Sequence, residues 1–306
     1  MTNAEFLFQQ FAASGDIGPA SDYVLETLPD GAYESVELSS LPIKIVNGSS
    51  VEGSVVWFPA GQLAAVKKIS FTVLTDSTDC TFYLLRIAPG MSFRLNGPGH
   101  SVLNLTKHRF GMSLRMGGDA GKSPGCQVIV GEYSFCAGAE AFLLNTTLTI
   151  KKGSLWSNYI LVQGSNQHGI VDLDRRMLVK YPRNHIALEP RAWIGRRAIL
   201  CAGAHIGAGA IVGTGALVAG KVPGACIVGG NPARVIKRNR TWAHSLHHIT
   251  KIEHGLIDQY AGLASSLPIA DKAVASLRFW WLKAVAAGMA GAAMFEGASE
   301  VLLVAL

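Results

Sequence analysis

The clearest pattern in the chain is an aliphatic residue that returns every six positions between residues 188 and 222. The series comprises Leu188, Ile194, Leu200, Ile206, Val212 and Val218. The residue four places after each member is small or aliphatic, and these positions hold Ala192, Ala198, Ala204, Ala210, Ala216 and Val222. A helix cannot keep this step, because its period of 3.6 drifts out of phase with six, and a single long strand needs a period of two.

A period of six predicts a three-sided coil in which each side is a short strand and each corner is a tight turn. The aliphatic residue points into the prism, the small residue lets the chain bend, and glycine relieves positions that need an unusual φ. Successive coils then stack as parallel strands about 4.8 Å apart. A flexible Gly/Ala-rich linker is the competing interpretation, but a linker has no reason to place an aliphatic residue at six consecutive steps.

The same pattern is weaker upstream. A step of six joins Val130, Cys136, Phe142 and Leu148, and after a shift of two residues it joins Ile150, Trp156 and Val162. Short β-rich runs separated by turn residues fill 41–128. We interpret 41–162 as irregular coils of the same β-helix, with a separate β-sandwich as the alternative. Residues 1–40 carry no motif that assigns them.

The repeat pauses between Val162 and Leu188, a distance that is not a multiple of six. Residues 163–187 are therefore expected to loop out of the coil, and such insertions in solenoids often collect on the binding face. Regular coils are expected over 188–232. From residue 233 the pattern is helical, so we expect 233–306 to form a helical cap on the open coil, with helices at roughly 241–265 and 270–295.

Composition adds three expectations. The net charge of +6 suits an anionic ligand such as a phosphorylated cofactor, and no basic and aromatic module points to nucleic acid. The five cysteines form no C-x-x-C pair, and no signal peptide precedes residue 16, so a cytoplasmic location is expected. The apolar stretch 279–306 is interrupted by charges, which favours a packed helix over a contact with the inner membrane face.

Several segments of the chain resemble the hexapeptide-repeat acyltransferases. They are Ala-Trp-Ile-Gly at 192–195, Ile-Gly-Ala-Gly-Ala-Ile-Val-Gly at 206–213 and Gly-Gly-Asn-Pro-Ala-Arg-Val-Ile-Lys at 229–237. The loop Ser-Asn-Gln-His-Gly-Ile-Val-Asp at 165–172 is similar to the branch that O-acetylates sugars and bacterial surface polysaccharides. This resemblance, strong over about 150–237, implies a left-handed parallel β-helix and a homotrimer with active sites between subunits. It also implies acetyl-CoA as co-substrate, a sugar or polysaccharide acceptor and a histidine base.

Transfer to a hydroxyl needs a base, because an alcohol is a poor nucleophile at neutral pH. His168 stands where the family has its catalytic histidine, and Asp172 matches an acidic position that could orient it; Asp174 is a second candidate. The family's other acid is replaced by Asn166, which can orient a ring but carries no charge. His185, three residues before Leu188, is the rival base, and His205 falls at a corner of the coil.

The resemblance also implies residues that hold the co-substrate. Trp193 is expected at a coil corner beside the pantetheine arm, with approachable backbone at Gly203, Thr214 and Gly215. Cations for the phosphates are expected at Lys221, Arg234 and Lys237, although Lys221 is one residue displaced from the family's usual lysine. Each of these residues also has an ordinary structural explanation, as a packing residue, a turn or a solvated charge.

Two other functions compete with acyl transfer. A zinc site like that of the β-helical carbonic anhydrases needs histidines five residues apart, and His205 has no partner at position 200 or 210. The group His244, His247 and His248 has no acid or cysteine near it in sequence, so no metal is expected. A non-catalytic β-helix scaffold is the alternative from another class, because it keeps the coils without needing a histidine in an excursion loop.

Overall fold

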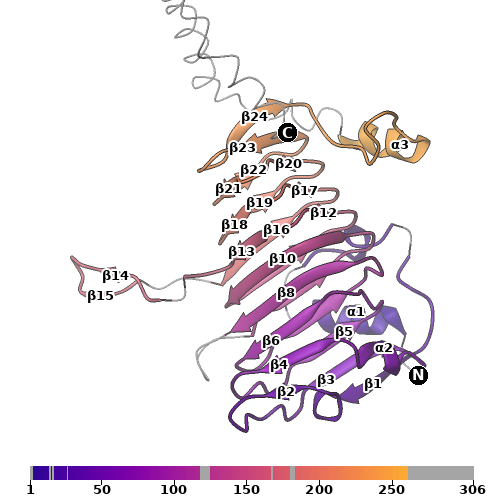
Figure 1. The fold of residues 1–306 in the computed structure, drawn as a ribbon, viewed down its shortest axis with the longest axis vertical. Helices are drawn as coiled ribbons and strands as arrows, with labels where there is room; N and C mark the ends of the chain where they lie inside the picture. The colour runs from indigo at the N-terminus through magenta and orange to yellow at the C-terminus, as the bar shows by residue number, and fades with distance from the viewer. Residues whose placement is uncertain are drawn as a thin grey trace, which may run out of the picture.

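The computed structural model describes residues 3–13, 15, 17–25, 27–117, 125–166, 168–179 and 183–260. Most of these residues wind into one parallel β-helix whose coils stack along the longest axis of the molecule (Figure 1). The sheets run without a break from the first coils to the last. The mainly β, coiled architecture is therefore confirmed, and the strands described within 41–162 belong to the same sheets as the later coils and not to a separate β-sandwich.

One side of the prism, called face A here, is a nine-stranded sheet that is parallel from β3 onward. Its strands in spatial order are β1 (Tyr33–Glu37), β3 (Val55–Pro59), β5 (Thr81–Leu84), β7 (Ser101–Asn104), β9 (Gln127–Val130), β11 (Thr146–Ile150), β16 (Asn184–Leu188), β19 (His205–Ile206) and β22 (Lys221–Val222).

The second side, face B, is the other long stack. It contains β2 (Lys44–Ile45), β4 (Ser70–Val73), β6 (Ser92–Asn96), β8 (Phe110–Gly117), β10 (Phe135–Leu144), β12 (Leu155–Trp156), β17 (Trp193–Ile194), β20 (Ile211–Val212), β23 (Cys226–Gly229) and β24 (Arg234–Arg238). The third side, face C, contains β13 (Ile160–Gln163), β18 (Ile199–Cys201) and β21 (Leu217–Val218).

Faces B and C separate at β10. The start of this long strand pairs with β12 and its middle pairs with β13, with an irregularity between Cys136 and Ala139 where it also pairs with β8. This irregularity shifts the inward positions by one residue, so Leu143 is buried and Phe142 is only partly buried. The expectation that Phe142 continues the inward step of six is therefore wrong, because a bulge moves side chains to the other face of a strand.

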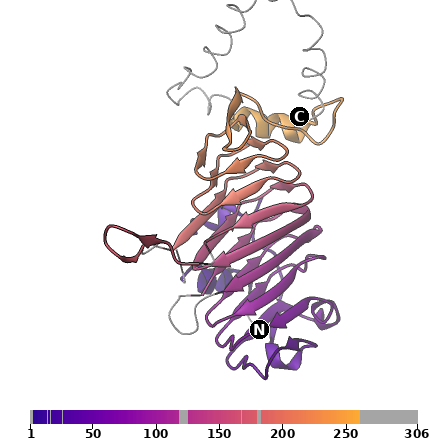
Figure 2. The same cartoon turned by 60° about the vertical axis from the view of Figure 1, so that its left-hand side comes forward.

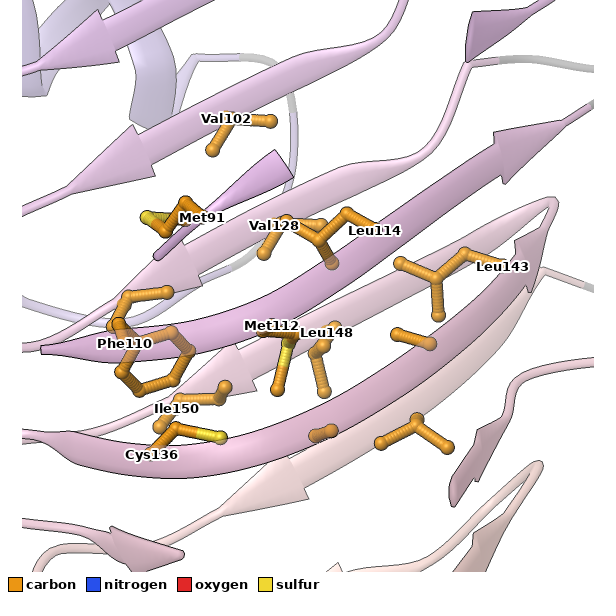
Figure 3. Packing of buried hydrophobic residues seen from close by; sticks show 14 of the residues in the cluster. Met91, Val102, Phe110, Met112, Leu114, Val128, Cys136, Leu143, Leu148 and Ile150 are labelled. Atoms are coloured by element: carbon orange, nitrogen blue, oxygen red, sulfur yellow. The ribbon is translucent and has the colours of Figure 1, made fainter. Parts of the chain in front are cut away.

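The interior of the prism is closely packed with the predicted aliphatic residues. Leu188, Ile194, Leu200, Ile206 and Val212 have no exposed surface. Neither have the five alanines that follow them by four positions, which confirms the inward and corner roles read from the repeat. Larger side chains fill the wider N-terminal coils, as Figure 3 shows for Met91, Phe110 and Met112.

Gly207 shows why small residues recur at the corners. A Cβ atom at Gly207 would collide with the backbone nitrogen of Gly224 on the next coil. The last coil is also shorter than the others: His205 lies 18 residues after its partner Ala187 but 16 before its partner Lys221. Val222 therefore stacks on Ile206 and occupies an aliphatic position, and its expected place among the small residues is wrong.

The described residues that precede β1 cover the outside of face A. Helix α1 (Ala4–Ala12), capped by Asn3 through its side chain and the amide of Phe6, buries Leu7, Phe8 and Phe11. These side chains form a second apolar cluster with outward residues of face A, including Tyr83. Two 3-10 turns, Ala20–Asp22 and Leu38–Ser40, flank β1, which runs antiparallel to β3; α2 (Leu63–Val66) follows β3. The segment without a sequence motif is thus a cover for the first coils.

The other end is closed by β24, which runs antiparallel to β23. Helix α3 (Lys251–Tyr260) begins 18 residues after the expected start at 233. Residues 234–238 form a strand instead of a helix, because they pair with the open edge of the sheet and this pairing outweighs their local helical pattern. The helix expected at 270–295 and the apolar stretch 279–306 lie outside the described residues. Within the described residues, no helix has both the length and the apolar character needed to cross a bilayer.

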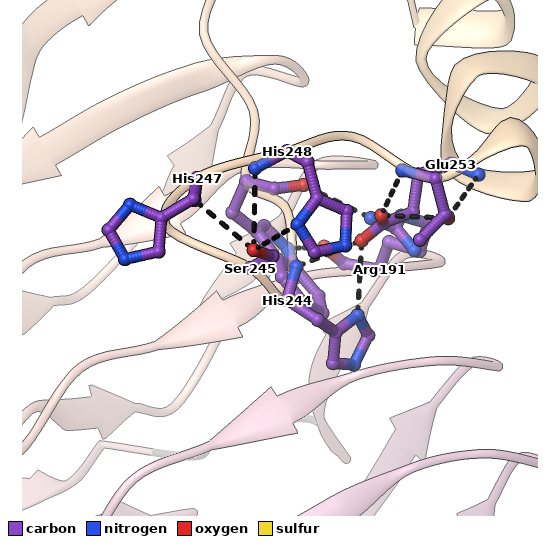
Figure 4. Close-up of polar contacts among 8 residues, drawn as sticks. Arg191, His244, Ser245, His247, His248 and Glu253 are labelled. Atoms are coloured by element: carbon purple, nitrogen blue, oxygen red, sulfur yellow. Dashed lines mark hydrogen bonds and ion pairs between the residues drawn. The ribbon is translucent and has the colours of Figure 1, made fainter.

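Residues 239–250 form a strap between β24 and α3. Trp242 is buried, its indole nitrogen donates to the carbonyl of Arg191 at 2.6 Å, and the Arg191 guanidinium lies 4.6 Å from its ring centre. Glu253 holds the far end of the strap, because its carboxylate accepts hydrogen bonds from the amides of His244 and Thr250 (Figure 4). These bonds, that of the His244 amide first, lower the pKa of Glu253 from 4.5 to about 2.

Leu200→Ala tests the coil interior. Removing a fully buried leucine is expected to lower the free energy of unfolding by about 2–5 kcal/mol, because lost transfer energy and a residual cavity add. Leu246→Ala is the matched control, since Leu246 is 96% exposed and its loss should change stability by less than about 0.5 kcal/mol. Denaturant unfolding of both variants measures the difference, and equal midpoints would contradict the packing described above.

The lowered pKa of Glu253 makes the strap sensitive to acid. The folded pKa lies below the unfolded value, so the stabilisation is complete above about pH 4.5 and is lost as the pH falls toward about 2. The protection factors of the His244 and Thr250 amides, which compare their hydrogen exchange with the intrinsic rate at each pH, should therefore fall across this window in the wild type. In Glu253→Gln the two amides should already exchange fast at pH 7. Unchanged protection in this variant would show that the Glu253 carboxylate does not hold the strap.

Candidate functional site

Three edges join the faces of the prism and carry the turns of each coil. Edge AB follows face A, edge BC follows face B, and edge CA follows face C. In the regular coils these edges pass through backbone positions with positive φ, namely Arg191 and Gly209 on edge AB, Arg197 and Gly215 on edge BC, and Gly203 on edge CA.

The excursion loop leaves the coil at edge CA, between β13 and β16. Its middle forms the hairpin of β14 (Val171–Asp172) and β15 (Met177–Leu178), which projects far from the prism (Figures 1 and 2). The coil resumes at Asn184, four residues before the expected 188. The hairpin exposes six large apolar side chains: Ile170, Val171, Leu173, Met177, Leu178 and Val179.

His168 lies in this loop just before the hairpin, and its ring is exposed. Asp172 is placed in the hairpin turn, where its Oδ1 accepts the amides of Asp174 and Arg175, both at 3.0 Å. Its Oδ2 lies 3.7 Å from Nε of Arg175. Among the described residues, no hydrogen bond joins His168 to Asp172, Asp174 or Asn166. Within one chain, Asp172 is therefore a turn residue.

Most of the predicted co-substrate residues gather on face B and edge BC. Trp193 stands outward on β17, in a column that continues through Ile211 and Ile227 to Lys237 on β24. Thr214 and Gly215 form the next corner, where both are exposed. Arg234 opens β24 beside the same edge, since the amide of its neighbour Ala233 donates to the carbonyl of Leu217.

The remaining two predicted residues lie on the other side of the prism. Gly203 is a corner of edge CA, and Lys221 projects from face A next to that edge. Both Gly203 and Gly215 have positive φ, +79° and +70°, and no atom lies within 4 Å of the position that a Cβ would take. An approaching ligand can therefore reach the backbone at either corner without displacing a side chain.

The two rival histidines lie on face A. The ring of His185 is exposed, and its Nε2 is 2.9 Å from Oγ1 of Thr149. The Nε2 of His205 is 3.1 Å from Glu189, whose other oxygen accepts from Lys151, which also pairs with Asp22 of the N-terminal cover. His205 thus belongs to a polar chain that links the cover to the coil.

Sequence reasoning missed the partner of Trp193. Its ring centre lies 6.3 Å from that of Trp242, which belongs to the C-terminal strap. The strap contributes this indole from a segment that was expected to be helical, so no local pattern pointed to the contact. A lone tryptophan amid polar residues at 239–250 was the available signal.

The geometry divides the candidate site into two halves. One half, with His168, is carried by edge CA, and the other half, with Trp193, Thr214, Gly215 and Arg234, is carried by face B and edge BC. In a three-sided prism edge CA lies opposite face B. A single chain therefore does not bring the two halves together.

The chain is similar in sequence to a curated protein. Over 138 residues the chain is 32% identical to the polysialic acid O-acetyltransferase of Escherichia coli O1:K1 / APEC, and the match spans 45% of each protein. The chain thus matches less than half the length of this curated relative. No family model matches.

One solved structure shows the same fold. The crystal structure of the polySia-specific acetyltransferase NeuO aligns with 74% of this chain and 93% of its own, with a TM-score of 0.51 and 18% identity. The polysialic acid O-acetyltransferase OatWY aligns with 71% of this chain and 94% of its own, with a TM-score of 0.43 and 13% identity. The left-handed parallel β-helix and the resemblance to sugar O-acetyltransferases are therefore confirmed.

Proposed function

We propose that the chain is an acyl-CoA-dependent O-acyltransferase that moves an acetyl group to a hydroxyl of a sugar or surface polysaccharide. The observation that carries the proposal is that the excursion loop, which contains His168, extends beyond the coils of its own chain. The 32% identity over 138 residues to a polysialic acid O-acetyltransferase supports the same reaction class.

In the proposed mechanism His168 is the general base. Its imidazole takes the proton of the acceptor hydroxyl as the oxygen attacks the thioester carbonyl, and returns it to the departing thiolate. Acetyl-CoA supplies the activated acyl group. The open corners at Gly203 on edge CA of one chain and at Gly215 on edge BC of a neighbouring chain offer backbone along which the pantetheine arm would lie, and Arg234 and Lys237 would face the phosphates. Backbone amides would stabilise the developing oxyanion.

The active unit is proposed to be a homotrimer with each site between two chains. Ring closure around a threefold axis packs two different surfaces of the same chain against each other. Edge CA of one chain can then face edge BC of the next, which brings the two halves of the site together. The six exposed apolar side chains of the hairpin support this arrangement, because a two-stranded ribbon is marginally stable alone and gains burial from a neighbour.

His168→Ala tests the base. With acetyl-CoA and a panel of sugar acceptors, thiol release should fall by about 10²- to 10⁴-fold while acetyl-CoA still binds, since only proton transfer is lost. His185→Ala is the parallel variant and should keep most of the activity. If the two results are reversed, His185 is the base. If the wild-type protein neither releases thiol nor binds acetyl-CoA, the non-catalytic β-helix scaffold becomes the better interpretation.

A mixing experiment tests the shared site. His168→Ala and Trp193→Ala are each expected to be inactive as pure proteins. Randomly reassembled 1:1 mixtures should recover about a quarter of the wild-type rate, because one site in four then combines an intact histidine with an intact tryptophan from the next chain. Thermal melting of Trp193→Ala serves as the folding control. No recovery from two folded variants would place both residues in one chain's site.

A further inference from the structure

We infer that Trp242 of the C-terminal strap is a positioning residue for the acyl-CoA half of the site, where it fixes the indole ring of Trp193. The inference rests on the proposed function, which sets Trp193 in the half of the site that holds the co-substrate. Trp242 is buried, whereas Trp193 is only partly buried, so Trp242 acts through Trp193 and not by contact with the co-substrate.

Trp193 has neighbours on three sides. Leu155 and Ile211 occupy the preceding and the following coil in the same outward column of face B. Trp242 adds a third neighbour, with the two ring centres 6.3 Å apart and the ring planes at 58°. Because Trp242 lies against Arg191 on edge AB, the side of Trp193 that stays open is the one toward edge BC, where the pantetheine arm is proposed to lie.

The orientation of the Trp193 ring depends on its contact with Trp242. Among the described residues, the Trp193 side chain forms no hydrogen bond, and the ring of Trp242 is the one aromatic ring packed against it. A partly exposed indole without a polar anchor can occupy more than one rotamer. A second indole that is itself held in place favours the rotamer in which the two rings pack, and so orients Trp193 before the co-substrate arrives.

Two buried charges hold the strap that carries Trp242. In the part of the chain that the structure describes, Arg191 and Glu253 are the only Lys, Arg, Asp or Glu residues that are buried. The Arg191 guanidinium donates to the carbonyl of Trp242 at 3.1 Å, while the Arg191 carbonyl accepts from the indole nitrogen. Glu253 binds backbone amides at the other end of the strap (Figure 4). Burying a charge costs free energy unless it is paired, and both of these charges are committed to fixing one short segment.

An apolar cover for the end of the β-helix would not be built in this way. Trp242 is the one buried residue of the strap, and Leu246 and Ile249 remain 96% and 45% exposed. A segment that served mainly as a cover would turn these two side chains inward, as helix α1 does with its apolar residues at the other end. The strap therefore brings a single indole ring to the side of Trp193 and holds it there.

A double-mutant cycle on the full chain, with direct binding of acetyl-CoA as the measurement, tests the inference. Trp242→Ala should raise the Kd for acetyl-CoA about tenfold, an effect in the range found for coupled neighbours. In the Trp193→Ala background the same change should alter the Kd by less than about twofold, because no ring is left to position. Trp57→Ala removes a tryptophan that packs against the N-terminal cluster, and this matched control should stay within about twofold of the wild type.

Kinetics and spectroscopy separate positioning from folding. Trp242→Phe keeps an aromatic ring but loses the donor to the Arg191 carbonyl. Its KM for acetyl-CoA should rise about threefold while kcat stays within about twofold, because the Trp193 ring contacts the co-substrate equally before and during the reaction. Two indoles in contact produce a paired positive and negative band in circular dichroism, and this couplet should be lost in Trp242→Phe and in Trp193→Phe alike.

The outcomes distinguish this inference from the proposed function. If Trp242→Ala weakens acetyl-CoA binding equally with and without Trp193, or does not weaken it, the positioning role is refuted. If Trp242→Ala does not fold, Trp242→Phe takes its place in the same cycle. A wild type that acetylates sugars but whose Kd for acetyl-CoA is insensitive to both tryptophans refutes the positioning role alone. A wild type that does not bind acetyl-CoA refutes the proposed function as well.

Discussion

Stacking between neighbouring coils is the interaction on which the whole molecule depends, because no coil can bury its own aliphatic residue alone. Strands such as β17 and β20 contain two residues each and would not persist in isolation. They are held because each rung hydrogen-bonds to the rungs on either side while its aliphatic side chain enters a fully closed interior. Residues at equivalent coil positions must therefore align in columns, and functional groups inherit the same spacing.

A stack of parallel strands leaves an open edge at each end, and this chain adds an antiparallel strand to face A at one end and to face B at the other. β1 reverses direction against β3, and β24 reverses against β23. Helix α1 and the strap around Trp242 then cover apolar surface near the two ends. These additions explain why more than fifty described residues outside the repeat are ordered against it, as solenoids generally require atypical ends.

The three edges consequently differ in what remains available for chemistry. Edge AB is largely occupied, since Lys152 donates to carbonyls of Ser21 and Val24 and Arg191 lies against Trp242. Edge CA carries the excursion loop, and edge BC stays open with glycine, tyrosine and arginine at its corners. Edges CA and BC are therefore the two surfaces left for a contact between chains, because a heterologous contact needs two different free surfaces.

The sequence by itself determined the coil, its inward residues and the position of the loop with His168, because a period of six is local and each coil contacts only its neighbours. It could not determine the bulge in β10 that displaces Phe142, the shortened last coil that moves Val222, or the strand at 234–238. Those depend on pairing between segments far apart in the chain. Only the tertiary structure decided that Asp172 serves a turn, that Trp193 meets Trp242, and that His168 and Trp193 lie on opposite sides of the prism. Such placements arise because each corner turns the chain onto a new face, and sequence distance does not reveal which face a side chain finally reaches.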